Sequence, residues 1–259
     1  MKHLRLQHVI IIALVVAATG CASYPPLSPI SEALPTGVTI TDTRRMIELK
    51  GPITPPDAAG LIFYPGGLVE PEAYVSLLAP VAEAGFPVII AKMPLDLAVT
   101  APNRGADLLD GYLAGESVTR LWALGGHSLG GAMAARFIAR EADSYPTVRG
   151  LILLGAYPPE SDSLAGTGRS VLSIWASEDG LATEKDRKET QRLLPEHAQI
   201  EIIDGGNHAG FGEYGPQRGD GERLIPLGRQ HAEVQELIKR FLDDMGCISD
   251  CRAVDGLIN

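Results

Sequence analysis

The chain contains 259 residues, of which 45% are hydrophobic and 21% are charged, and its formal net charge at pH 7 is −10. The length and composition are typical of a globular protein with one large α/β domain. The acidic balance argues against nucleic acid, or an anionic membrane surface, as an electrostatic partner.

The first twenty residues have the features of an export signal. Lys2 and Arg5 precede an apolar run over residues 9–18, which ends in small residues. The run is shorter than the roughly 20 residues that a transmembrane helix needs, and the order charged, apolar, small is typical of a signal peptide. We therefore predict a signal peptide over residues 1–20.

Cys21 follows this segment directly. Residues 18–21 read Ala-Thr-Gly-Cys and resemble a bacterial lipobox, in which the cysteine is lipidated and becomes the mature N-terminus, although lipoproteins usually carry leucine where Ala18 stands. The resemblance implies a lipidated Cys21 with a Ser/Pro-rich tether over residues 21–36. It also implies a place in the bacterial cell envelope, on the (outer) membrane and facing the periplasm or the exterior. Several acyl chains would anchor the protein stably, and a plain secretory signal is the alternative.

Residues 37–259 are expected to form the folded domain. Alternating polar and apolar residues over 38–50 predict half-exposed strands at an antiparallel sheet edge. Further strands, most of them continuous apolar runs, are expected at 59–64, 87–92, 121–124, 150–156, 170–176 and 198–203. Helices are expected between and after them at 71–84, 102–113, 129–140, 183–194 and 230–244. This alternation predicts a mostly parallel sheet with helices on both faces, and residues 157–169 are too few for a cap domain.

A strand-to-helix junction carries the strongest chemical signal. Gly126-His127-Ser128-Leu129-Gly130 lies between a predicted strand and a predicted helix, which is the context that the Gly-x-Ser-x-Gly nucleophile elbow requires. In such a turn the serine is strained and closely packed, so glycine is favoured two residues before and after it. We predict that Ser128 is a nucleophile; the alternative is an ordinary helix N-cap serine.

A serine hydroxyl needs a base, and the base needs an acid that orients it. On this scaffold the acid precedes the histidine along the chain. His208 lies in a glycine-flanked loop after the last predicted strand and is the expected base. Asp179 follows the strand over 170–176 and is the expected acid, with Glu178 and Asp204 as competitors.

The negative charge that forms during attack needs two hydrogen-bond donors. One is expected to be the backbone N–H of Leu129, directly after the nucleophile. The other is expected from the Gly-rich loop after the strand over 59–64, as the N–H of Gly67 or Leu68.

The two remaining cysteines, Cys247 and Cys251, are close enough in sequence to form a small disulfide loop in an exported protein. Free thiols on a helix end are the alternative. A zinc site is not expected because no second Cys/His pair lies nearby.

Together these residues resemble the α/β-hydrolase superfamily over about residues 60–244. The stretch from Gly205 through Gly221 resembles a lid-free branch similar to the dienelactone-hydrolase group, which carries cysteine where this chain has Ser128. The resemblance implies a serine hydrolase that cleaves small to medium carboxylic esters through an acyl-enzyme, with no metal or organic cofactor. The alternatives are a catalytically silent binding lipoprotein and an amidase or thioesterase of the cell envelope. The sequence does not indicate the oligomeric state.

Overall fold

The computed structural model describes residues 23–113 and 120–255, with side chains described up to Gly111 and from Arg120 to Gly246. Cys21 therefore lies outside the described residues, as do the side chains of Cys247 and Cys251. Within the described part, no helix combines the length and the apolar character needed to cross a bilayer.

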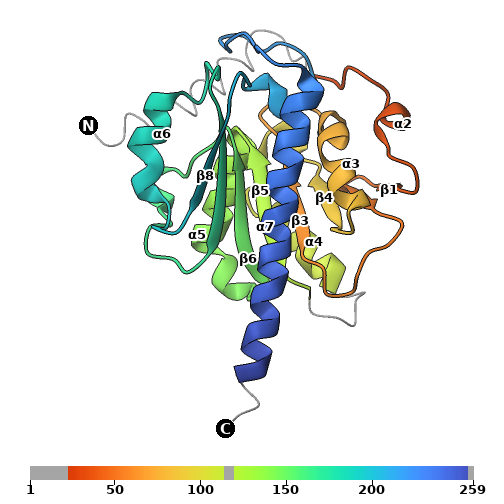
Figure 1. The fold of residues 1–259 in the computed structure, drawn as a ribbon, viewed down its shortest axis with the longest axis vertical. Coiled ribbons are helices and arrows are strands. Elements are labelled where there is room, and N and C mark those ends of the chain that lie inside the picture. Colours follow the sequence, from red (N-terminus) through yellow and green to blue (C-terminus); the bar gives the residue numbers. More distant parts are fainter. Residues whose placement is uncertain (1–22, 114–119, 256–259) are drawn as a thin grey trace.

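A central sheet of eight strands organises the domain (Figure 1), in the order β1-β2-β4-β3-β5-β6-β7-β8. β1 and β2 are antiparallel to their neighbours, and the other neighbouring strands pair in parallel. The strands are β1 (Thr39–Asp42), β2 (Met46–Lys50), β3 (Gly60–Tyr64), β4 (Val88–Ala91), β5 (Trp122–His127), β6 (Val148–Leu154), β7 (Ser170–Ala176) and β8 (Gln199–Ile203). The predicted antiparallel edge and mostly parallel sheet are both confirmed.

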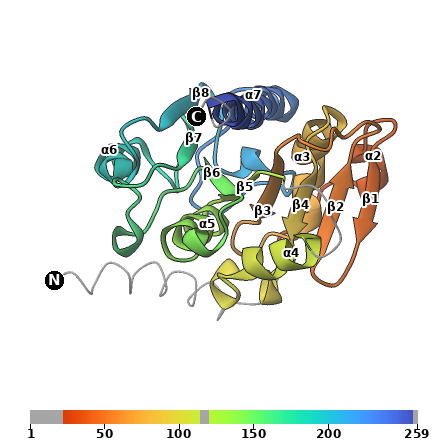
Figure 2. The same ribbon diagram turned by 90° about the horizontal axis from the view of Figure 1, so that it is seen from below.

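Helices cover both faces of the sheet (Figure 2). On one face α3 (Val75–Glu83) packs beside α7 (Leu227–Asp255), and on the other face lie α4 (Arg104–Leu113) and α5 (Leu129–Arg140). Two separate apolar clusters fill the space between these helices and the sheet. Because both of their faces are covered, β3, β4 and β5 are buried along their whole length, which explains their continuous apolar sequences.

Most predicted elements are found within a few residues of their expected bounds. β5 continues to His127, three residues beyond its expected end, and β6 begins and ends two residues earlier than expected. The other main differences lie at helix ends. The helix expected over 183–194 is the short α6 (Glu184–Thr190) followed by a 3-10 turn, Gln191–Leu193. Thr183 caps α6 through a reciprocal capping box with Asp186. The last helix is longer than expected and begins at Leu227. Between β6 and β7 there is only one 3-10 turn, Glu160–Asp162, and no cap domain.

The segment that we expected to be a tether differs most from prediction. Tyr24 forms a parallel bridge with Val69, and residues 30–33 form a one-turn helix, α2 (Ile30–Ala33). Partly buried side chains from this segment, Tyr24 and Ile30 among them, pack against the core cluster around α3. From Ser23 onwards the chain therefore lies against the domain instead of extending away from it, because its apolar side chains pack against this core cluster.

Candidate active site

The turn between β5 and α5 has the geometry of a nucleophile elbow. Ser128 has φ 51° and ψ −121°, a left-handed conformation that is unfavourable for a residue with a side chain. A Cβ atom on Gly130 would lie 2.2 Å from the carbonyl oxygen of Tyr64, and one on Gly126 would lie 2.6 Å from the carbonyl carbon of Gly130. Backbone occupies both places, so any residue other than glycine would disrupt the turn.

The side chain of Ser128 makes no capping hydrogen bond to its own helix. An ordinary N-cap serine would accept a hydrogen bond from a backbone N–H in the first turn of the helix. The backbone N–H of Ser128 instead donates to Leu154 at the end of β6, at 3.0 Å. Ser128 therefore does not act as an ordinary N-cap.

Asp179 and His208 form a buried pair at the carboxyl ends of β7 and β8. The imidazole Nδ1–H donates to Asp179 Oδ2 at 2.7 Å, and both side chains are almost completely buried. Asp179 Oδ1 accepts backbone hydrogen bonds from Leu181 at 2.8 Å and Ala182 at 2.7 Å, which hold the carboxylate in place.

This pairing sets the tautomer of His208. An ionised carboxylate only accepts hydrogen bonds, so the proton resides on Nδ1 and the lone pair on Nε2. The Nε2 atom is buried and has no hydrogen-bond partner among the described residues. It is therefore available to accept a proton.

The two competing acids lie elsewhere. Glu178 is half-buried and its carboxylate accepts a hydrogen bond from the Ser177 hydroxyl at 2.9 Å. Asp204 is exposed at the end of β8. The fold thus brings Asp179 to the imidazole and leaves the other two carboxylates outside the site.

His127 and Gly155 connect the serine turn to the acid–base pair. The ring of His127, the residue before Ser128, lies 4.4 Å from the ring of His208 between centroids. Gly155, which follows the residue that binds the Ser128 N–H, has φ 49°, and a Cβ atom there would lie 2.9 Å from Asp179 Oδ2. A side chain at position 155 would displace the acid, so the pairing of Asp179 with His208 depends on glycine at this position.

The loop after β3 has one backbone N–H that has no hydrogen-bond partner among the described residues. Gly66 donates to the Tyr74 hydroxyl at 2.9 Å, and Leu68 donates to the carbonyl of Asp96 at 2.7 Å. The Gly67 N–H has no partner among the residues that the structure describes. Of the two residues predicted here, Leu68 is already engaged and Gly67 is free to bind an oxyanion.

Gly67 also lies beside the second expected donor. A Cβ atom on Gly67 would be 3.1 Å from the Leu129 side chain. Leu129 is the first residue of α5, and the N–H groups of the first helical turn have no partner within the helix. Gly67 and Leu129 therefore come together at the positive end of the α5 dipole.

Sequence reasoning missed a buried network behind this loop. The Tyr74 hydroxyl, which accepts from Gly66, lies 2.8 Å from Nδ1 of His127 and can donate its proton there. Burial raises the pKa of Tyr74 well above its ordinary value and lowers the pKa of His127 well below 6.5. His127 is therefore neutral beside His208, and the network ties the oxyanion loop to the base. Nothing in the sequence marks Tyr74, because its partners come from distant segments.

Asp220 is a second residue that was not predicted. Its Oδ1 accepts from the backbone of Gly180 at 3.2 Å and of His208 at 3.1 Å, and its Oδ2 accepts from Ala209 at 2.8 Å. One carboxylate thus holds the loop of the acid and the loop of the base. Asp220 lies between two glycines in the sequence, but the role of its carboxylate depends on contacts across the fold.

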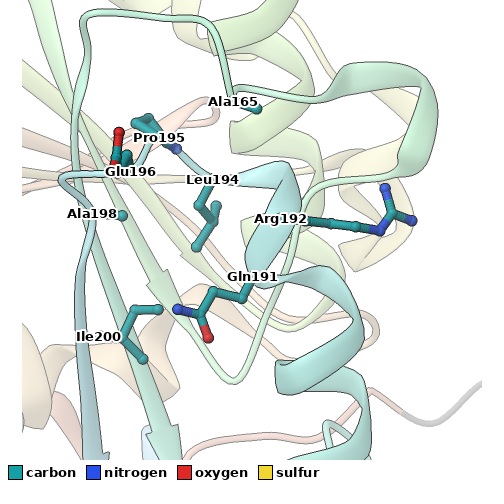
Figure 3. Close-up of a pocket in the computed structure, with 8 residues that line it drawn as sticks. All are labelled: Ala165, Gln191, Arg192, Leu194, Pro195, Glu196, Ala198 and Ile200. Carbon is teal, nitrogen blue, oxygen red and sulfur yellow. The ribbon is translucent and has the colours of Figure 1, made fainter.

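A pocket elsewhere on the domain is separate from these residues (Figure 3). It is open, has a volume of about 370 Å³, and lies between the 3-10 turn after α6, the β6–β7 connection and β8. Ser128, Asp179 and His208 do not line it. In the described part of the chain, no three His, Cys, Asp or Glu side chains are grouped so that they could hold a metal ion.

The fold and this site define a class of protein: α/β enzymes that carry a strained serine between a strand and a helix, with a buried acid–histidine pair beside it. Comparison with protein families leads to the same class. The model of the alpha/beta hydrolase family matches residues 60–232, and the chain belongs to that family.

Solved structures share the fold at low sequence identity. A CIB-like hydrolase from Thermoplasma acidophilum has a TM-score of 0.58 and 16% identity, over 79% of this chain and 100% of that one. A hyperthermophilic esterase from Pyrobaculum calidifontis has a TM-score of 0.58 and 16% identity, over 82% of this chain and 88% of that one. The butyrate-bound esterase Est2 from Thermogutta terrifontis has a TM-score of 0.57 and 14% identity, over 82% and 95% of the two chains. The comparison with curated proteins finds no match.

Proposed function

We propose that the protein is a serine hydrolase that cleaves small to medium carboxylic esters through an acyl-enzyme on Ser128. The observation that carries this proposal is the buried hydrogen bond between Asp179 and His208, at 2.7 Å, next to a strained serine turn. A purely structural histidine would not need an aspartate that fixes its tautomer and leaves Nε2 without a partner.

In the proposed reaction the Ser128 hydroxyl attacks the ester carbonyl while Nε2 of His208 takes its proton. Asp179 stabilises the imidazolium that forms. The backbone N–H groups of Leu129 and Gly67 bind the oxyanion, each contributing about 3 kcal/mol if they act like comparable donors. His208 then returns its proton to the leaving alcohol, and in the second half-reaction it activates the water that releases the acid.

The substrate range is proposed from the architecture. The β6–β7 connection holds a single 3-10 turn, so no cap domain is inserted between these two strands. Among the structures that share the fold are esterases, one of which has butyrate bound. We also place the chain in a lid-free branch similar to the dienelactone-hydrolase group, on the strength of the motifs between Gly205 and Gly221.

Export and anchoring are part of the proposal. The charged, apolar and small-residue order over residues 1–20 supports a signal peptide, and the Gly-Cys end of that segment supports lipidation of Cys21. Acyl chains on Cys21 would hold the enzyme on a membrane of the cell envelope.

The proposal is tested by hydrolysis of p-nitrophenyl esters from acetate to decanoate, with a protein that begins at Ala22. Turnover should be lost in Ser128→Ala and kept in Ser144→Ala, which changes an exposed serine in a 3-10 turn. A fluorophosphonate probe should label the wild type and Ser144→Ala but leave Ser128→Ala unlabelled. Equal background rates in all three proteins, without labelling, would instead support a silent binding protein. Labelling without ester turnover would favour an amide or thioester substrate.

A further inference from the structure

The N-terminal end of the described chain is bound to the loop that carries the proposed oxyanion donor. The Tyr24 N–H donates to the carbonyl of Leu68 at 2.6 Å, and the Glu70 N–H donates to the carbonyl of Tyr24 at 3.0 Å. The Ser23 hydroxyl donates to the side chain of Asp96, whose carbonyl accepts from Leu68. We call residues 23–27 the N-terminal arm.

The arm brings the proposed anchor close to the active site. Cys21 precedes Ser23 by two residues, and two residues of extended chain span at most about 7 Å. Acyl chains on Cys21 would therefore begin next to the loops that bear Gly67 and Asp96. In Figure 1 the arm, in red, comes to the top of the domain, where the loop between β8 and α7, in blue, also lies.

The same edge exposes apolar side chains on both sides of the arm. Leu95 is 78% exposed and directly precedes Asp96, which binds Ser23. Leu27, at the end of the arm, is 65% exposed, and its N–H donates to the carbonyl of Glu213 at 2.9 Å. Two apolar side chains thus point into solvent next to the place where the acyl chains would start.

The backbone at Leu95 is strained as well. Leu95 has φ 57° and Asp96 has φ 52°, and each such residue costs on the order of 1 kcal/mol or more. The hydrogen bonds that Asp96 makes to Leu68 and Ser23 hold this turn in place. In water this strain is not offset by any packing of the exposed Leu95 side chain. Contact of that side chain with lipid would offset it.

Charge at this edge excludes one way of binding lipid. Glu70, Glu72 and Asp96 lie close enough together that Glu72 and Asp96 raise the pKa of Glu70, after the larger effect of burial. Glu72 is paired with Lys92 at 3.0 Å, but the carboxylates of Glu70 and Asp96 keep this edge acidic, so anionic headgroups would be repelled. Attachment would therefore depend on the acyl chains and on insertion of apolar side chains, and it would not need anionic lipid.

We infer that the active-site edge of this protein faces a lipid bilayer, with Leu27 and Leu95 in contact with the membrane on either side of the N-terminal arm. This inference rests on the proposed lipidation of Cys21 and deepens the proposed function. In this orientation, the esters that lie closest to Ser128 would be those that partition into the membrane.

The test uses the full-length, acylated protein in phosphatidylcholine vesicles that contain brominated acyl chains, which quench tryptophan at membrane depth. Trp122 and Trp175 are buried and supply a constant background. The emission added by Leu95→Trp and by Leu27→Trp should be quenched severalfold more than that added by Glu196→Trp. Glu196 is exposed and precedes β8. It therefore lies at the amino ends of the parallel strands, whereas the active site lies at their carboxyl ends.

Leu27→Trp keeps the test valid if the strained turn does not accept tryptophan at position 95. Equal quenching at positions 27, 95 and 196 would overturn the inference, and so would a full-length protein that carries no acyl chains. Neither result would affect the ester hydrolysis measured with the soluble protein. Conversely, Ser128→Ala should leave the quenching pattern unchanged, so failure of the esterase proposal would be recognised separately.

Discussion

The carboxylate of Asp220 accepts a hydrogen bond from the backbone N–H of His208 at 3.1 Å, although twelve residues separate the two along the chain. The same carboxylate binds the backbone of Ala209 and of Gly180, the residue after the proposed catalytic acid. The relative position of acid and base is therefore held by a third side chain that itself contacts neither of their functional groups.

Replacing Asp220 should impair turnover more than binding. Asp220→Ala removes all of these charge-assisted bonds, each of which contributes about 1.5–3 kcal/mol, and a misplaced base costs on the order of 100-fold in rate. We expect kcat to fall at least tenfold with little change in KM, and partial recovery in Asp220→Asn, which keeps one acceptor oxygen. Asp204→Ala, at an exposed aspartate nearby, is the control. An unchanged kcat in Asp220→Ala would show that the two loops keep their positions without Asp220.

Replacing Asp179 should have a larger effect on rate. In Asp179→Asn the amide cannot stabilise the imidazolium and can donate to Nδ1, which favours the wrong tautomer of His208. We expect ester turnover to fall about 1,000-fold or more. Glu178→Gln should stay close to wild type in the same assay because Glu178 does not contact the imidazole. A larger loss in Glu178→Gln than in Asp179→Asn would move the acid role to Glu178.

Tyr74→Phe tests the network behind the oxyanion loop. The change removes the hydroxyl that accepts from Gly66 and lies beside Nδ1 of His127. Two buried polar groups then lose their partner, at about 1–3 kcal/mol each. Urea denaturation should show a loss of about 2–6 kcal/mol in the free energy of unfolding, and kcat should fall because the loop carrying Gly67 is less restrained. Tyr145→Phe, at a partly exposed position, should show neither effect.

Because of His231, we expect the free energy of unfolding to decrease in mild acid. It is buried in α7, and burial lowers its pKa to about 4 from 6.5. Below pH 6.5 the His231 side chain is protonated in the unfolded chain, but in the folded chain it stays neutral until about pH 4. The free energy of unfolding therefore falls as the pH drops through this window. The full effect is about 3 kcal/mol.

Urea denaturation at a series of pH values checks this prediction. His231→Gln should flatten the curve between pH 6.5 and pH 4, while His197→Gln, at an exposed histidine, should follow the wild type. His127 is also buried and its pKa is also lowered, so part of the slope should persist in His231→Gln. A curve that is equally steep in wild type and His231→Gln would contradict the assignment.

The N-terminal arm should matter for turnover even in a soluble protein. Removing residues 22–26 deprives the Leu68 carbonyl and the Glu70 N–H of the backbone of Tyr24. We expect a protein that begins at Leu27 to have a lower kcat than one that begins at Ala22, and a KM that changes less. If the two proteins had equal kcat values, the arm would be no more than a tether.

Local signals were enough to predict much of this protein. Continuous apolar runs identified the buried strands, and the spacing of Gly126, Ser128 and Gly130 indicated the elbow, because a sharp turn excludes side chains at two fixed distances from the serine. Chain order then placed an acid after β7 and a histidine after β8, since loops at the carboxyl ends of parallel strands meet at one edge.

Other features were decided only in the tertiary structure. Asp179, rather than Glu178 or Asp204, reaches the imidazole because the backbone of residues 181–182 holds its carboxylate there. Leu68 cannot be distinguished from Gly67 until Asp96 is seen to occupy its N–H. Tyr74, Asp220 and the N-terminal arm act through partners that lie far away in sequence. Hydrogen bonds between distant segments leave no periodicity or spacing in the chain, so only folding reveals them.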